Sequence, residues 1–169
     1  MFKVEYKNEM PYTYHAENPR NHYLIDGANG FCNKGNFCES AAKFHRGLAY
    51  LTNPSTAALD GYDIPEEKAE VKSGAGGLGR KIGELDFTVS QQIRYYFQHK
   101  PADSKWIWIV FNDKTQMVTE YHMNKSEFGA FLHIALRSRQ HLQSNKKSIN
   151  VRFKNTSKKM LAWLDGRCA

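Results

Sequence analysis

Two kinds of charged side chain stand in this chain at a spacing suited to metal-assisted hydrolysis. Glu70 and Lys72 flank Val71 in a segment of strand character, so the two charged side chains are expected on one face and Val71 on the other. An aspartate, Asp60 or Asp63, ends the preceding segment of strand character. Where such segments pair, two carboxylates and an ammonium converge. This set suits a hard divalent cation with a lysine beside its bound water.

The charge balance of the chain favours a polyanionic partner. The 24 lysines and arginines exceed the 17 acidic residues, which gives a net charge of +7 and a pI near 9.3. From Arg137 onward the only acid is Asp165. Such a surface attracts nucleic acid most simply, although a solubilising face is the alternative. Together with the acid–lysine set, this charge indicates cleavage of a phosphodiester.

Length and composition predict one domain with a real core. The chain has 169 residues, 41% of them hydrophobic, and no linker or repeat. Its strongest apolar run, Trp106–Phe111, is too short to cross a bilayer, and the charged N-terminus lacks a secretory signal. The three cysteines do not form a disulfide framework and are expected as reduced thiols. We therefore expect a cytoplasmic protein without a membrane partner.

The first half of the chain is expected to hold an arm, a helix and two strands. Residues 1–33 form an irregular arm with a short strand at Phe2–Tyr6; it is either mobile or an ordered cover over the core. A helix is predicted from Asn36 to Leu51, with Asn36 as the N-cap and Glu39 completing a capping box. Short strands follow at Thr56–Ile64 and Lys68–Ser73, joined by a turn.

The second half alternates helices and strands. The predicted elements are a helix at Ser90–His99, strands at Trp106–Asn112 and Thr115–Met123, a helix from Asn124 to about Gln143, a strand at Ser148–Lys154 and a helix at Ser157–Leu164. Trp106 and Trp108 share one face of the central strand. The fold class is α/β, with residues 34–169 forming a mixed central sheet flanked by helices.

The acid, acid-x-lysine pattern resembles that of the PD-(D/E)XK nucleases, which have the restriction-endonuclease-like fold. It stands here as Asp60-Gly-Tyr-Asp63, then Glu70-Val-Lys72, and the resemblance extends by topology over roughly residues 35–153. The proline of the family name is absent before Asp60. The resemblance implies a restriction-endonuclease-like core and metal-dependent cleavage of DNA.

By this resemblance, Asp60 and Glu70 bind Mg²⁺ or Mn²⁺ with the Val71 carbonyl as a third ligand. Lys72 then orients or helps to deprotonate the attacking water, or stabilises the transition state. Asp60 gives the spacing D-x9-E-x-K and is favoured over Asp63, which gives D-x6-E-x-K and is expected to cap the turn.

Accessory positions each have two interpretations. Glu39 is either a further acid at the metal or only the capping-box residue. Gln91, with Tyr95, resembles the Q-x-x-x-Y element of some members, although a surface glutamine is the alternative. The glycine-rich loop 74–83 lacks a P-loop ending, so no nucleotide cofactor is expected. It is either a plain surface loop or a phosphate contact through Arg80 and Lys81.

The sequence thus predicts a Mg²⁺-dependent endodeoxyribonuclease of restriction, homing or phage type, intracellular in a bacterium or phage host and, by resemblance, a homodimer. Candidate contacts to DNA phosphates are the following basic residues: Arg80, Lys81, Lys125, Arg137, Arg139, Lys146, Lys147, Arg152 and Lys154. The alternatives are a non-catalytic nucleic-acid-binding domain of the same fold, a nuclease similar to Holliday-junction resolvases, and a basic interaction module whose acidic cluster is only an ion-pair network.

Overall fold

A four-stranded mixed sheet forms the centre of the molecule. The computed structural model describes residues 1–15, 17, 23–49, 61–73, 86–90, 100–137, 148–152 and 157–168. The strand order is β1-β7-β6-β4, with bounds Phe2–Lys7, Met117–Asn124, Lys105–Asn112 and Ala69–Ser73. β4 runs parallel to β6, whereas β6–β7 and β1–β7 are antiparallel. The predicted α/β class and mixed sheet are confirmed; the finer assignment to a restriction-endonuclease-like core stays a prediction.

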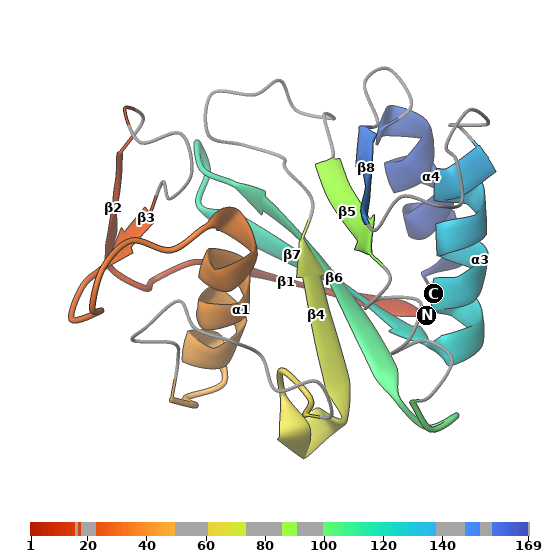
Figure 1. The fold of residues 1–169 in the computed structure, drawn as a ribbon, viewed down its shortest axis with the longest axis horizontal. Coiled ribbons are helices and arrows are strands. Elements are labelled where there is room, and N and C mark those ends of the chain that lie inside the picture. The colour runs from red at the N-terminus through yellow and green to blue at the C-terminus, as the bar shows by residue number, and fades with distance from the viewer. Residues whose placement is uncertain are drawn as a thin grey trace.

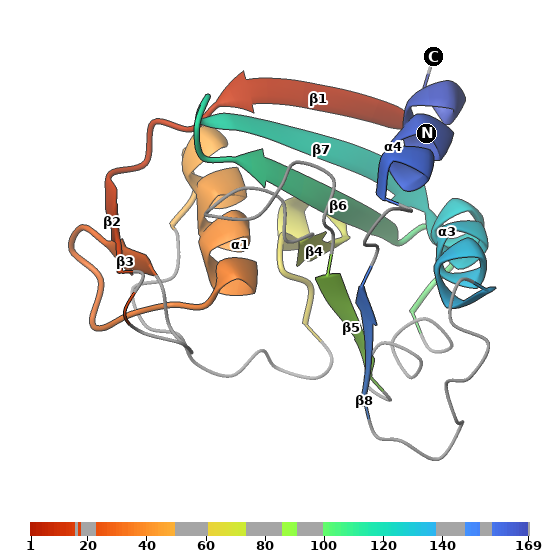
Figure 2. The ribbon, with the colours of Figure 1, turned by 90° about the horizontal axis from the view of Figure 1, so that it is seen from above.

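Helices lie on both sides of this sheet (Figures 1 and 2). The described helices are α1 (Lys34–His45), α3 (Lys125–Arg137) and α4 (Ser157–Arg167). On one face, Ile107 and Ile109 of β6 pack in a cluster with Phe37 of α1. On the other, Trp106 stacks on Phe128 of α3 at a ring separation of 5.1 Å. This alternation follows from the period of two along a strand, and it makes β6 buried on both faces.

Two smaller antiparallel sheets accompany the central one. β2 (Tyr12–Tyr14) pairs with β3 (Tyr23–Ile25), and β5 (Asp86–Ser90) pairs with β8 (Ser148–Arg152). The ring of Tyr23 is fully buried and stacks on Phe37 at 4.3 Å. Because β1 belongs to the central sheet and β2–β3 seals the α1 face, the described part of residues 1–33 is an ordered cover over the core. The short strand predicted at Phe2–Tyr6 is confirmed.

The predicted N-cap of α1 is wrong. Asn33, not Asn36, is the N-cap, and its side-chain oxygen accepts the backbone N–H of Asn36 at 2.9 Å. The helix ends at His45 rather than near Leu51, and Gly47 follows with a φ of +69°, a conformation that glycine adopts without strain. Both asparagines are competent caps, so only packing of the helix distinguishes them.

Among the other predicted elements, two strands and the start of one helix are confirmed. The strands around Trp106–Asn112 and Thr115–Met123 are confirmed as β6 and β7. The start of α3 is also confirmed: Asn124 Oδ1 accepts the N–H of Glu127 at 2.8 Å, and Glu127 Oε1 accepts that of Asn124 at 3.0 Å. Ser90 is the last residue of β5, a strand that the sequence did not predict, and the rest of the helix predicted at Ser90–His99 lies outside the described residues. None of the helices in the described segments is long and apolar enough to cross a membrane.

Candidate metal centre

Strand β4 places Glu70 and Lys72 as the alternation predicted. In the parallel ladder with β6, Val71 lies beside Ile107, whereas Glu70 and Lys72 lie beside Trp106 and Trp108. Glu70 and Lys72 therefore share the face opposite to α1, and Val71 joins the α1-facing core. Glu70 is 4% exposed. A carboxylate so deeply buried needs nearby cations or hydrogen-bond donors to remain charged.

Asp63 is folded back onto the edge of β4 that faces away from β6. Ile64 and Ala69 exchange two backbone hydrogen bonds of 3.0 and 3.1 Å around the short helix η1 (Pro65–Glu67). This tight return lets Asp63 Oδ2 accept the backbone N–H of Val71 at 2.7 Å. The prediction that Asp63 caps the turn thus agrees with its contact. The same contact also holds its carboxylate next to the acid-x-lysine strand.

Glu39 comes to the site from α1. The start of the helix lies close to the end of β4, since a Cβ added to Gly35 would stand 3.9 Å from Ser73 Oγ. Glu39 follows one turn later, and its side chain is 14% exposed. Because Asn33 is the N-cap, Glu39 is not the third residue of a capping box, and that interpretation is wrong. Among its neighbours is Lys43, whose Nζ lies 4.0 Å from Glu39 Oε2.

The three carboxyl groups of Glu39, Asp63 and Glu70 influence one another. Burial, followed by hydrogen bonding and repulsion from Asp63, raises the pKa of Glu39 to about 8. Burial and the charge of Asp63 raise the pKa of Glu70 to about 7, against the opposing effect of Lys72 and Lys100. Such mutual repulsion in a buried place is relieved when a divalent cation binds between the carboxylates.

Two ammonium groups accompany these acids. Lys72 is half-buried on the face of Glu70 and acts to lower the pKa of that carboxyl. Lys100, in the turn before β6, is 8% exposed and places Nζ 3.3 Å from Glu70 Oε1. Lys100 Nζ also donates to the carbonyl of Gly61 at 3.1 Å and lies 4.1 Å from the centre of the Tyr62 ring. Sequence reasoning missed Lys100, because no periodicity or spacing marks it.

The donor types fit a hard divalent cation. Carboxylate oxygens are its preferred ligands, and the buried Glu70 Oε1 accepts no hydrogen bond from any residue that the structure describes. The N–H and C=O of one strand residue point to the same side, so the Val71 carbonyl faces the edge where Asp63 lies. Within the described residues, no three His, Cys, Asp or Glu side chains are already arranged around one point as metal ligands. The donor set fits in its chemistry, and its closure around an ion is a proposal.

Most of the predicted nucleic-acid contacts, and two site residues, lie outside the described residues. These are Asp60, Gln91, Arg80, Lys81, Arg139, Lys146, Lys147 and Lys154. Arg137 and Arg152 lie on α3 and β8, but their side chains are not described. Lys125 is half-buried, and its Nζ donates to the carbonyl of Lys100 at 3.0 Å. Its ammonium therefore braces the turn that carries Lys100.

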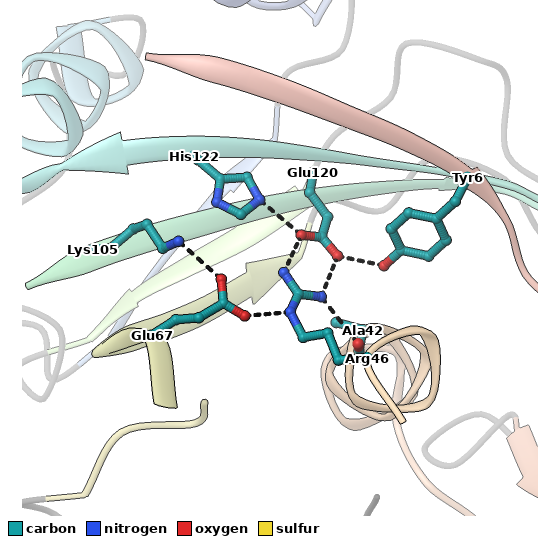
Figure 3. A network of polar contacts seen from close by, with 7 residues as sticks. All are labelled: Tyr6, Ala42, Arg46, Glu67, Lys105, Glu120 and His122. Atoms are coloured by element: carbon teal, nitrogen blue, oxygen red, sulfur yellow. Dashed lines mark hydrogen bonds and ion pairs between the residues drawn. The ribbon is translucent and has the colours of Figure 1, made fainter. Parts of the chain in front are cut away.

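A second polar cluster, which we call the Arg46 network, lies between α1 and the sheet (Figure 3). Arg46 Nη1 and Nη2 donate to the two carboxylate oxygens of Glu120 at 2.7 and 2.6 Å, and Arg46 Nε donates to Glu67. The Tyr6 hydroxyl donates to Glu120, and His122 Nε2 lies 2.8 Å from it. The network joins the end of α1 to η1 and β7. It therefore fixes α1, from which Glu39 extends, and η1, which follows Asp63 in the chain.

The cysteines take no part in the site. Cys32 and Cys38 are buried, Cys168 is half-buried, and none of the three forms a disulfide. Burial raises the pKa of Cys32 to about 11, which keeps it protonated.

Comparisons of the chain with protein-family models, curated proteins and solved structures find no match.

Proposed function

We propose that this chain is a metal-dependent endonuclease that hydrolyses DNA phosphodiester bonds. The observation that carries the proposal is the approach of three carboxyl groups, from α1, the turn before η1 and β4, to one another beside Lys72. Buried like charges from three separate elements are costly to fold together. A site for a cation explains why the fold brings them together.

Each residue has a role in this proposal. Glu70, Asp63 and the Val71 carbonyl hold Mg²⁺ or Mn²⁺, with Glu39 near the ion and Asp60 as a further ligand. The cation, when bound, neutralises charge on the phosphate and lowers the pKa of a coordinated water. Lys72 directs its ammonium to the face of Glu70, where it orients the attacking water or stabilises the negative charge that develops on the phosphate.

The basic charge of the chain supports DNA as the polyanion. A net charge of +7 raises the local concentration of DNA and makes binding fall steeply with salt. Cutting both strands at one place needs two such centres, so we propose that the active form contains two copies of the chain.

The test is cleavage of supercoiled plasmid at low salt with Mg²⁺ or Mn²⁺. We expect nicked or linear product from the wild type, and a loss of at least about 100-fold in Glu70→Gln and Lys72→Met. The matched controls are Glu66→Gln and Lys114→Met, because both residues are exposed, Glu66 in η1 and Lys114 in the turn between β6 and β7. Circular dichroism establishes that each variant is folded. A folded wild type without activity, or cleavage unchanged by both site substitutions, would refute the proposal.

A further inference from the structure

Lys100 stands against Glu70 without a hydrogen bond between them. The side chains of Lys100 and Glu70 are 8% and 6% exposed, and Nζ lies 3.3 Å from Oε1. That oxygen accepts no hydrogen bond within the described structure. The contact is therefore an ion pair held by charge and not by directed bonding. The ammonium does donate a hydrogen bond to the carbonyl of Gly61, at 3.1 Å.

This arrangement places a positive charge on the oxygen that a metal would use. A magnesium–oxygen bond is about 2.1 Å long, so a cation on Glu70 Oε1 would lie within roughly 5.5 Å of Lys100 Nζ as it now stands. An ammonium and a divalent cation repel each other strongly at such a distance in a buried place. Either the metal binds more weakly, or Lys100 moves away from Glu70 when the metal binds.

We propose that Lys100 is a built-in counter-cation that neutralises Glu70 in the metal-free protein and competes with the divalent ion for it. This inference rests on the proposed metal centre and adds a residue that sets its affinity. Lys100 thus acts on the metal only through Glu70, and its effect is to oppose metal binding. It keeps the carboxylate site folded when no metal is bound, and it weakens the binding of metal.

Lys100 has a second role that predicts the opposite effect. Through Gly61 and the Tyr62 ring it anchors the segment leading to Asp63, and Tyr62 is held further by a 2.7 Å contact between its hydroxyl and Ser104 Oγ. If anchoring dominated, removal of Lys100 would disorder Asp63 and weaken metal binding. The charge effect should dominate, because Asp63 is held independently by the N–H of Val71.

Three substitutions separate charge from anchoring. Lys100→Gln removes the charge and keeps a donor for the Gly61 carbonyl, Lys100→Met removes both, and Lys100→Arg keeps the charge. Calorimetric titration with Mn²⁺ and with Mg²⁺ at fixed ionic strength measures the dissociation constants. We expect Lys100→Gln to bind about tenfold more tightly than wild type, Lys100→Met to bind more tightly by a smaller factor, and Lys100→Arg to match wild type. Lys114→Gln is the control for loss of a distant positive charge.

Thermal unfolding without metal provides a second readout. Because Glu70 loses its counter-cation, Lys100→Gln should unfold at a lower temperature than wild type in EDTA and should recover more than wild type on addition of Mn²⁺. Unchanged or weaker metal binding in Lys100→Gln, with wild-type binding intact, overturns the role of Lys100 alone. A wild type that binds neither metal overturns the proposed function as well. If the unfolding temperature of Lys100→Gln in EDTA then also equals that of wild type, the ion pair between Lys100 and Glu70 does not stabilise the fold.

Discussion

Asp63 Oδ2 accepts the backbone N–H of Val71 at 2.7 Å, so the aspartate is bonded to the same strand that presents Glu70 and Lys72. The bond connects two segments that no periodic pattern links. It gives Asp63 two separable functions. Its oxygen satisfies a strand-edge donor, and its charge contributes to the candidate metal centre.

Substitution of Asp63 should separate these functions. Asp63→Asn keeps an oxygen that accepts from Val71 but removes the charge, so we expect stability close to wild type and metal binding at least about tenfold weaker. Asp63→Ala loses both and should cost about 1–3 kcal/mol in unfolding free energy. Urea denaturation and metal titration measure the two effects. Equal metal affinity in Asp63→Asn and wild type would contradict a role for its charge.

Glu39→Gln should stabilise the metal-free protein. The substitution removes one of three neighbouring buried carboxyl groups while retaining the shape of the side chain. We expect an increase of roughly 1 kcal/mol in unfolding free energy at pH 8 in EDTA, and a smaller stabilisation by Mg²⁺ than in wild type. The comparison variant is Glu66→Gln, at an exposed position, which should change neither quantity. A decrease in metal-free stability would count against crowding of the carboxylates.

The two candidate caps of α1 allow a matched pair of substitutions. Asn33→Ala removes the oxygen that accepts from the N–H of Asn36, and it should destabilise the protein by about 1 kcal/mol. Asn36→Ala replaces a residue inside the first turn and should be neutral or slightly stabilising. Thermal unfolding of the two variants is the measurement. The reverse order of effects would restore Asn36 as the cap.

The Arg46 network should give the protein a defined sensitivity to acid. Burial acts to raise the pKa of Glu120, but hydrogen bonds from Arg46, His122 and Tyr6 outweigh it and lower the pKa to about 2. A carboxyl whose pKa is lower in the folded state than in the unfolded state adds stability above the unfolded value near 4.5. We therefore expect about 3 kcal/mol to be lost as the pH falls from 4.5 to 2.

Glu120→Gln tests this assignment. It leaves Arg46 with a neutral partner and should cost about 3–5 kcal/mol at pH 7, while flattening the dependence of stability on pH between 4.5 and 2. Guanidinium denaturation over a pH series measures both effects. Tyr6→Phe removes one donor only and serves as the graded control, at about 1 kcal/mol. An acid transition that persists unchanged in Glu120→Gln would assign it to other carboxyl groups.

Local pattern predicted those parts of the fold that local chemistry decides. β6 is a buried run of bulky residues, and α3 begins with a capping box whose two hydrogen bonds form within four residues. The start of α1 was misjudged because Asn33 and Asn36 have equal intrinsic competence as caps. Burial of Phe37 and Ala41 against the sheet decides between them, and that depends on strands distant in sequence.

The candidate site shows the same division. Alternation along β4 correctly predicted that Glu70 and Lys72 share a face. Lys100 and the Arg46–Glu120 pair escaped prediction, because they meet their partners across 30 and 74 residues of chain. Such pairs follow from the tertiary arrangement and leave no periodic trace. Besides the alternation along β4, the i,i+4 spacing of Glu39 and Lys43 was a local signal available from the sequence.

The pairing of the first strand with the last strand of the central sheet, in chain order, has a consequence for protein synthesis. β1 has no partner in this sheet until β7, about 110 residues later, has left the ribosome. At 5–20 residues per second, that interval lasts roughly 5–20 s. During it the nascent chain carries an unpaired strand edge, so a chaperone that shields such edges should raise the yield of folded protein.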